Sequence, residues 1–320
     1  MKKILFIVNP ISGTSNKSRI LKQIDKLLDK SLYSYEVVKT ENAGHAENIA
    51  RDAVEKGIDI VCAIGGDGTV NEVARGIINT NTALAIIPCG SGNGLARHLH
   101  IPMDATRAIK LINSAVVHKI DYGMVNSHPF FCTCGIGLDA FISQKFAESG
   151  KRGLTTYIEN ALKTVLRYQP ETYDLEVENE SSEHYSYKAV LIACANACQW
   201  GNNAYIAPKA SVHDGLLDVI IVEPFTKLEA ANMAVQLMRG SLDRHSKIRT
   251  LRCKRVLIKR PEEGALHFDG DPMIESANVE VSIVKDGLKC VCSEDEGVQT
   301  VGTNLLNFLR GYKNNVMMRF

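Results

Sequence analysis

The sequence has 320 residues, of which 45% are hydrophobic and 23% are charged, and its formal net charge is +1. This length accommodates two domains, and the balanced charge excludes a general electrostatic attraction to nucleic acid. No apolar run reaches the ~18–20 residues that cross a bilayer, and the run 4–8 is too short for a secretory signal. We therefore expect a cytoplasmic protein with reduced cysteines, whose membrane contacts are peripheral.

Strand-like and helical patterns alternate through the first part of the sequence. Strands are predicted at 3–9, 34–39, 58–64 and 83–87, and helices at 17–30, 45–56, 69–79 and 104–113. Strands that alternate with helices pair in parallel and are covered on both faces. The pattern therefore predicts a doubly wound α/β domain over residues 1–124.

The pattern changes after residue 124. Strands are predicted at 129–134, 172–178, 187–194, 216–222, 253–259, 278–284 and 288–292, and only two clear helices interrupt them, near 155–168 and 226–240. This pattern is typical of an antiparallel sandwich, which we place at 125–297. We expect the helix at 226–240 to pack in the core, and the segment 298–320 to form a short helix that packs back on the first domain.

Glycine-rich turns recur where the strands of the first domain end. They read NPISG at 9–13, TENAG at 40–44, GGDGT at 65–69 and PCGSGNG at 88–94. The carboxyl ends of parallel strands meet at one edge of the sheet, where ligands bind. Glycine lets the backbone approach a ligand and present N–H groups. A single turn of this kind is explained by steric need alone, but four at one edge predict a phosphate-binding site.

Two common nucleotide motifs are absent. The sequence contains no GxxxxGK[ST] and no GxGxxG after the first strand, which excludes a P-loop enzyme and an ordinary Rossmann dehydrogenase. Asp67 lies within the third turn, where a carboxylate would repel phosphate unless it binds Mg²⁺ or accepts a proton from a nucleophile. The alternative is that Asp67 caps the helix predicted at 69–79.

The stretches NPISG, GGDGTVNEV and PCGSGNGLA, in this order, resemble the diacylglycerol kinase catalytic-domain superfamily, and the resemblance covers about residues 3–295. It implies an α/β nucleotide-binding domain similar to those of NAD kinases and phosphofructokinases, followed by a β-rich domain. It also implies ATP and Mg²⁺ as cofactors. The cofactor-binding residues implied are Asn9, Ser12, Gly13, Thr40, Gly65, Gly66, Asp67, Gly68, Thr69, Asn71, Glu72, Gly90, Ser91, Gly92, Asn93 and, in a basic turn, Arg152.

The same resemblance assigns roles to residues of the second domain. Asp139, in GIGLDA, matches an aspartate that lies near the lipid headgroup in the family. Asp67 is expected to contact the lipid substrate as well. A structural metal site in some bacterial members corresponds to Asp214 with the carbonyl oxygens of Ser211 and Leu216, and Asp121 matches an acidic position of the family's metal network. From the residues alone, the Asp-Gly pair at 214–215 is equally well explained as a hairpin turn. Gly94 replaces an aspartate that is usual in the family.

The stretch HFDGDP at 267–272 resembles the family's D-G-E element, with Asp271 in place of the glutamate. Phosphoryl transfer needs positioning, charge neutralisation and a base. The base is expected to be Asp67, Asp269 or Asp271, and the sequence does not decide among them. A carboxylate in this role needs a raised pKa, which partial burial or a like charge provides.

These features predict an ATP-dependent lipid kinase whose acceptor is a primary hydroxyl of diacylglycerol or of a sphingoid base. The alternatives are a kinase of a soluble metabolite, such as an NAD kinase, and a nucleotide-binding regulator without catalysis. The stretch 244–260 holds eight Lys and Arg residues and no acidic residue, which suggests a peripheral contact with anionic headgroups or simply a solvated face. No nucleic-acid partner is expected, and a homodimer is compatible with the sequence.

Overall fold

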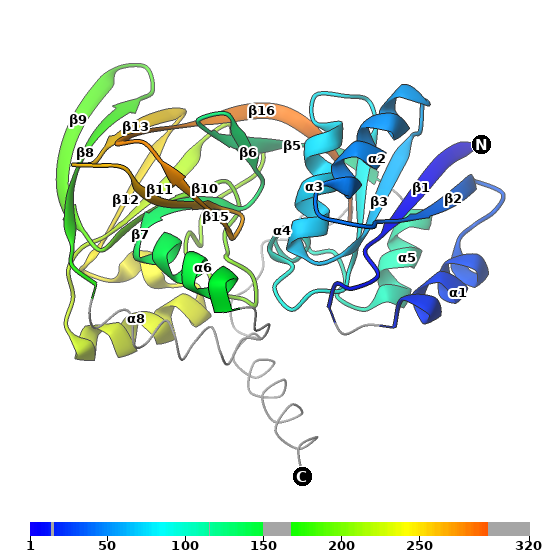
Figure 1. The fold of residues 1–320 in the computed structure, drawn as a ribbon, viewed down its shortest axis with the longest axis horizontal. Helices are drawn as coiled ribbons and strands as arrows, with labels where there is room; N and C mark the ends of the chain where they lie inside the picture. The colour runs from blue at the N-terminus through cyan, green and yellow to red at the C-terminus, as the bar shows by residue number, and fades with distance from the viewer. Residues whose placement is uncertain (14–15, 115, 150–167, 294–320) are drawn as a thin grey trace, which may run out of the picture.

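The computed structural model describes residues 1–13, 16–114, 116–149 and 168–293. The first domain contains four parallel strands in the order β2-β1-β3-β4 (Figure 1). Their bounds are β1 Lys2–Val8, β2 Tyr33–Lys39, β3 Ile60–Gly65 and β4 Ala83–Pro88. β3 and β4 are buried along their whole length, and β1 is buried and apolar after its first two lysines, as expected for strands covered on both faces.

The helices of this domain pack in two pairs, α1 with α5 and α2 with α3, on the faces of the sheet (Figure 1). Their bounds are α1 Lys17–Leu27, α2 His45–Glu55, α3 Asp67–Ile77 and α5 Ala105–Asn113. A short helix, α4, follows β4 at Gly94–His98 and was not predicted. The doubly wound α/β arrangement expected from the sequence is thus confirmed.

The second domain is a sandwich of two sheets. One is an antiparallel sheet in the order β12-β11-β10-β7-β14-β15. Its strands are β7 Thr133–Gly137, β10 Leu191–Ala195, β11 Leu217–Val222, β12 Ile248–Cys253, β14 Gly264–Phe268 and β15 Asp271–Glu275. A buried apolar cluster, which includes Ile136, Tyr173 and Val256, fills the space between this sheet and the second one. The predicted antiparallel sandwich is therefore present.

The second sheet of the sandwich continues into the sheet of the first domain. β16 (Asn278–Cys292) pairs antiparallel with β5 (Val116–Val125) and β13 (Arg255–Lys259), and its last residues pair in parallel with β4. β8 (Glu171–Glu178), β9 (Ser182–Ala189) and β6 (His128–Phe130) complete this ten-stranded sheet. The predicted boundary at residue 124 therefore lies near the end of a strand that belongs to both domains.

Several elements of the second domain differ from the sequence predictions. Helix α6 (Leu138–Ser149) directly follows β7 and was missed, and so were β14 and β15, which overlap the stretch HFDGDP at 267–272. The strands predicted at 278–284 and 288–292 form the single strand β16, which has an irregularity between Val284 and Leu288. The helix predicted near 155–168 and the segment 298–320 lie outside the described residues, apart from residue 168.

Helix α8 (Lys227–Arg239) was expected to pack in the core, but of its side chains only Met233 is buried, with Leu237 partly buried against the same cluster. Leu228 and Val235 are exposed, at 83% and 46% of their surface. A 3₁₀ turn at Leu242–Arg244 follows it. None of the helices in the described ranges is both long and apolar enough to cross a membrane.

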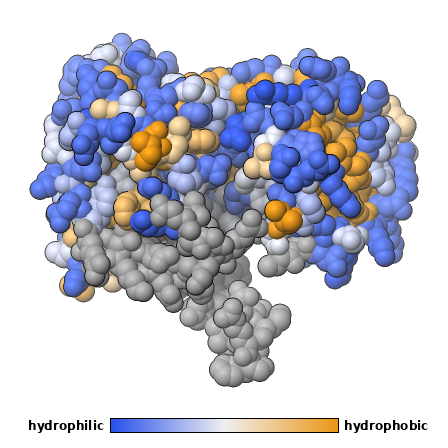
Figure 2. Space-filling model, viewed as in Figure 1, coloured by the Kyte–Doolittle hydropathy of each residue, from blue (hydrophilic) through white to orange (hydrophobic). Residues whose placement is uncertain are grey.

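The basic stretch 244–260 forms the end of this turn, β12 and β13, and most of its charges have partners. The pairs are Arg249 with Glu223, Arg252 with Asp214 and Asp218, Arg255 with Glu178 and Glu280, and Lys259 with Glu176. Arg260 is buried and donates to backbone carbonyl oxygens. Figure 2 shows hydrophilic and hydrophobic residues mixed over the described part of the face in view. The stretch is therefore a poor candidate for a continuous cationic surface.

Candidate active site

Four turns follow the carboxyl ends of β1 to β4, and hydrogen bonds connect them. Asn9, at the end of β1, donates from Nδ2 to Thr69 Oγ1 at 3.1 Å, and the Ser12 hydroxyl donates to the Asn9 carbonyl oxygen at 3.1 Å. The backbone N–H of Thr40 donates to the Val8 carbonyl oxygen at 2.9 Å. The residues predicted to bind a cofactor on the first domain therefore share one edge of the sheet.

Gly13 is the position in these turns that most clearly requires glycine. Its φ is +59°, and a Cβ placed there would lie 1.8 Å from the Cys89 carbonyl oxygen. The turn after β1 thus lies directly against the turn after β4. The turns after β3 and β4 are joined too, because the Cys89 N–H donates to the Gly65 carbonyl oxygen at 2.7 Å.

The turn after β4 is closed by Asn93. Its Oδ1 accepts from the Gly90 N–H at 3.2 Å, and its Nδ2 donates to the Gly90 carbonyl oxygen at 2.6 Å. Ser91, at the tip, is exposed. The Gly92 carbonyl oxygen accepts from Arg97 Nε at 2.7 Å, so this turn has a cation beside it that the sequence analysis did not identify.

Asp67 is the first residue of α3, but its carboxylate binds the start of α4. Oδ2 accepts from the Asn93 N–H at 2.8 Å and Oδ1 accepts from the Gly94 N–H at 2.7 Å. Asp67 therefore does not cap its own helix, whose N-cap is Gly66. Each carboxylate oxygen keeps acceptor capacity for a further partner. Its predicted contacts with metal, substrate or proton remain predictions.

A side-chain hydrogen bond joins α3 to the second domain at this edge, where the Asn202 N–H also donates to the Gly92 carbonyl oxygen at 3.3 Å. Asn71, in the second turn of α3, donates from Nδ2 to Asp269 Oδ2, which belongs to the turn between β14 and β15. Asn71 is 3% exposed, and its Oδ1 has no hydrogen-bond partner among the described residues. A buried oxygen without a partner is costly unless a ligand, a cation or water reaches it.

Asp269 is held by an unusual number of donors. Oδ1 accepts from the N–H groups of Cys132 and Thr133 at 2.8 and 3.1 Å, and Oδ2 accepts from the Phe131 N–H at 2.7 Å as well as from Asn71. Its φ of +49° places it in the left-handed region. Burial raises the pKa of Asp269 to about 6, although these four hydrogen bonds act in the opposite direction. The carboxylate thus fastens the turn to the segment between β6 and β7.

Asp271, two residues further, has a different environment. The residue is exposed, and no hydrogen bond reaches its carboxyl group from the described part of the chain. Partial burial of the carboxyl nevertheless raises its pKa; Arg75 opposes this shift and Glu72 adds to it. Glu72, at the same time, accepts from the Ala46 N–H at the start of α2 at 3.1 Å. Asp271 therefore has a carboxylate that is near α3 and available to a ligand.

Asp139, predicted to lie near the lipid headgroup, is buried and paired. It is 4% exposed, its Oδ1 accepts from the Ala140 N–H at 2.8 Å, and its Oδ2 lies 3.1 Å from His267 Nε2. A Cβ on Gly135 would lie 2.1 Å from Asp139 Oδ2, so glycine makes room for this pair. His267 Nδ1 accepts from the Gly270 N–H at 3.4 Å, which connects the pair to the β14–β15 turn. The sequence analysis did not single out His267.

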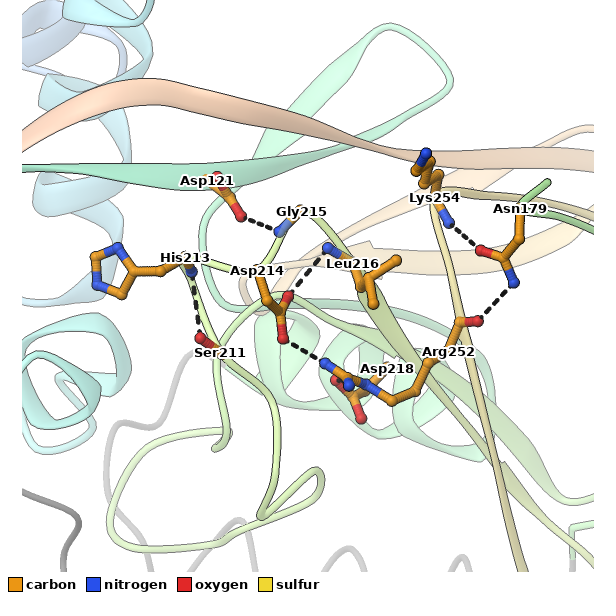
Figure 3. Close-up of polar contacts among 10 residues, drawn as sticks. All are labelled: Asp121, Asn179, Ser211, His213, Asp214, Gly215, Leu216, Asp218, Arg252 and Lys254. Atoms are coloured by element: carbon orange, nitrogen blue, oxygen red, sulfur yellow. Dashed lines mark hydrogen bonds and ion pairs between the residues drawn. The ribbon is translucent and has the colours of Figure 1, made fainter.

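The residues expected to form a metal site lie together in Figure 3. Asp121 is fully buried, and its Oδ2 and Oδ1 accept from the N–H groups of Gly215 and Asp286 at 2.7 and 2.8 Å. Asp214 Oδ1 accepts from the Leu216 N–H at 3.0 Å, and Ser211 Oγ accepts from the His213 N–H at 3.3 Å. These bonds close the turn 211–216 on β5. Among the described residues, no hydrogen bond or ion pair joins the Asp121 side chain to the turns after β3 and β4.

Within the described ranges, no three His, Cys, Asp or Glu side chains are grouped so as to hold a metal ion. Mg²⁺ in nucleotide sites is typically held by one or two protein oxygens together with phosphates and water. The partnerless Asn71 Oδ1 and the available Asp271 carboxylate fit that smaller requirement. Arg152, the remaining residue predicted to bind the cofactor, lies outside the described residues.

Comparison with known proteins is consistent with this geometry. A model described as the diacylglycerol kinase catalytic domain matches residues 3–125, and one described as the YegS C-terminal NAD kinase beta sandwich-like domain matches residues 133–291. A diacylglycerol kinase of Bacillus subtilis (strain 168) is 27% identical over 276 residues, which cover 85% of this chain and 90% of the relative. A diacylglycerol kinase of Staphylococcus haemolyticus is 28% identical over 267 residues, covering 83% and 81%.

The fold agrees as well. The crystal structure of a diacylglycerol kinase from Bacillus anthracis str. Sterne superposes with a TM-score of 0.71 at 21% identity and covers 92% of this chain and 97% of that one. The two family models together span nearly all of the described residues, in the order that the sequence motifs predict. The chain therefore belongs to the diacylglycerol kinase catalytic-domain superfamily of lipid kinases.

Proposed function

We propose that this protein transfers the γ-phosphoryl group of ATP to a primary hydroxyl of a membrane lipid, either diacylglycerol or a sphingoid base. The observation that carries the proposal is the hydrogen bond from Asn71 to Asp269. It holds the β14–β15 turn, with Asp271, beside the start of α3 and the glycine-rich turns. A phosphate group bound at those turns would therefore lie close to a carboxylate that can receive a proton.

We assign the role of general base to Asp271 rather than to Asp269. The Asp269 carboxylate already accepts four hydrogen bonds, so it has little capacity for a substrate hydroxyl. Asp271 has a raised pKa, which makes it a stronger base than an ordinary aspartate, and its carboxyl is accessible. Aspartate is one methylene shorter than glutamate. The substrate hydroxyl must therefore bind closer to the backbone of the β14–β15 turn.

Mg²⁺, when bound, supplies neutralisation of the phosphate charge. Asn71 Oδ1 is the oxygen of this chain that would hold it, which leaves the Asp271 carboxylate available as the base. The N–H groups of the glycine turns and the N-terminus of α3 orient the phosphates. Arg97 lies beside the turn after β4 and adds positive charge there.

The acceptor must be reached at a membrane surface, and we propose that this contact is peripheral. The exposed apolar side chains Leu228 and Val235 on α8 support it better than the stretch 244–260, whose charges are mostly paired. Flotation with phospholipid vesicles tests the contact. Leu228→Ser should weaken binding if α8 takes part, and unchanged binding would exclude this helix.

The proposed reaction is tested by transfer from γ-labelled ATP to a panel of acceptors in mixed micelles: diacylglycerol, sphingosine and ceramide, with NAD as a soluble acceptor. Asp271→Asn should lower kcat by about 10²–10⁴-fold without lowering the unfolding temperature. The matched control is Asp174→Asn, which removes an exposed carboxylate on β8.

Each result of this assay has a definite meaning. Transfer to NAD alone would show a soluble-metabolite kinase, and absence of transfer to every acceptor would refute the proposed reaction. If Asp271→Asn transfers phosphate as fast as Asp174→Asn, the base has been assigned to the wrong residue.

A further inference from the structure

The turn 211–216 was expected to bind a divalent cation through Asp214, but the structure places a cation of the protein at that carboxylate. Figure 3 shows Arg252, on β12, directed toward Asp214 and Asp218. We propose that the Arg252 guanidinium does in this chain what a structural metal ion would do at this turn. The turn is then closed without a divalent cation, and removing the guanidinium converts Asp214 into a cation-binding position.

The sheet register sets the position of Arg252. Arg252 lies directly opposite Asp218 in the antiparallel pair of β11 and β12, and its Nε lies 3.5 Å from Asp218 Oδ2. The other end of the guanidinium contacts Asp214 Oδ2. One planar group with several N–H donors hydrogen-bonds Asp214 and stays in ion-pair contact with Asp218, whose Oδ2 accepts no hydrogen bond from the described residues.

Burial makes the guanidinium important at this position. The Asp218 side chain is only 3% exposed, and no other cation of the described chain lies within ion-pair distance of it. A buried carboxylate whose cation is removed is strongly destabilising. Asp214 is 32% exposed and Arg252 is 44% exposed, so the outer part of the cluster is open to water and to ions.

The backbone around Arg252 is also fixed. Asn179 donates from Nδ2 to the Arg252 carbonyl oxygen at 2.9 Å, and its Oδ1 accepts from the Lys254 N–H at 3.2 Å (Figure 3). On the other side of the turn, Asp121 accepts from the Gly215 N–H. The turn is therefore held from β5 and from β12 at once.

In the unmodified chain, the contacts that Asp214 already makes disfavour binding of Mg²⁺ to its carboxylate. Oδ1 accepts from the Leu216 N–H and Oδ2 is occupied by Arg252. A divalent cation bound there would lie beside a guanidinium, and the repulsion between like charges would oppose binding. Without the guanidinium, the Asp214 carboxylate keeps one N–H donor and becomes an oxygen ligand of the kind that Mg²⁺ accepts, with water completing the coordination.

The test is the unfolding temperature of the full chain without nucleotide, in EDTA and in millimolar MgCl₂. The unmodified protein should unfold at the same temperature in both. Arg252→Gln should unfold roughly 3–6 °C lower in EDTA and recover part of this loss in MgCl₂. Arg255→Gln is the matched control, since Arg255 pairs with exposed Glu178 and Glu280, and it should change the unfolding temperature by less than about 2 °C and show no response to Mg²⁺.

A double variant, Arg252→Gln with Asp214→Asn, should lose the recovery in MgCl₂, which locates the response at this turn. Should Arg252→Gln not fold, Arg252→Lys keeps one positive charge and should give a smaller loss. The proposal is overturned if MgCl₂ raises the unfolding temperature of the unmodified protein. It is also overturned if Arg252→Gln behaves like Arg255→Gln, or if its loss is not reduced by Mg²⁺. Because no readout depends on phosphate transfer, the result is independent of the proposed reaction.

Discussion

Replacing Asn71 by alanine removes the hydrogen bond that joins α3 to the β14–β15 turn. The acceptor is a carboxylate, and a hydrogen bond to a charged group contributes about 1.5–3 kcal/mol to stability. The Asn71 Oδ1 has no partner among the described residues, so its loss adds little to this cost. For a chain of this length we expect the unfolding temperature to fall by roughly 3–6 °C.

The same substitution should affect catalysis more than stability. Asp269 would still be held by three backbone N–H groups, but the turn would lose its hydrogen bond to α3. Because a displacement of about 1 Å at a reacting group can cost 10²-fold in rate, we expect kcat to fall by about 10–100-fold. The Asn71 hydrogen bond lowers the Asp269 pKa, so its removal should raise that pKa above about 6.

Labelled-ATP transfer and thermal unfolding should be measured on Asn71→Ala and on Asn113→Ala. Asn113 also makes side-chain hydrogen bonds, to the Leu27 carbonyl oxygen and from the Asp29 N–H, but it joins α5 to α1 away from the turns. We expect Asn113→Ala to lose stability and keep its kcat. If both variants keep kcat, the contact between Asn71 and Asp269 is only structural and the reasoning is refuted.

Three further predictions concern single groups. Gly13→Ala should raise the KM for ATP and lower the unfolding temperature, because the alanine Cβ would clash with the Cys89 carbonyl oxygen. Gly57→Ala is the control: its φ is similar but no atom lies near the added Cβ, so it should lose stability only. Since the folded pKa of Asp269 is raised from 3.8 to about 6, this group's contribution to stability should be largest below pH 3.8 and decrease by the order of 3 kcal/mol as pH rises through 6. Denaturant unfolding of the protein and of Asp269→Asn over this range should therefore show the larger pH dependence in the protein. Asp139→Asn should leave the buried His267 without its carboxylate partner. It should reduce lipid phosphorylation more than ATP binding. Equal losses in both would contradict the assignment of Asp139 to the lipid headgroup.

The first domain was predictable because its signals are local. Each strand is an apolar run, and each helix shows hydrophobic residues at helical spacing. Each turn at the carboxyl end of a strand contains glycine. What the sequence did not show is which turns touch. Asp67 illustrates this limit: its side chain binds the N–H groups of Asn93 and Gly94, twenty-six and twenty-seven residues away, whereas sequence reasoning considered only its own helix as a structural partner.

The second domain was less predictable because its contacts are distant in sequence. The stretch HFDGDP has strong turn signals, which concealed the ends of the two short strands that overlap it. β15 accepts Pro272 because it is the edge strand of its sheet. Helix α6 follows β7 without a polar linker, so its apolar residues were not separated from the strand. Arg252 could be recognised as the partner of Asp218 only after the register of β11 and β12 was known.

The shared sheet explains why a single side-chain contact can matter at the active site. β5 and β16 run through both domains and are hydrogen-bonded over most of their length, so the backbone fixes the orientation of the sandwich relative to β4. The β14–β15 turn, however, belongs to the other sheet, at its edge, where no further strand holds it among the described residues. Its position over α3 therefore depends on the hydrogen bonds of Asp269, and of these only the one from Asn71 comes from the first domain. Asp271 follows two residues later, so a change at Asn71 is transmitted to the proposed base through a very short piece of chain.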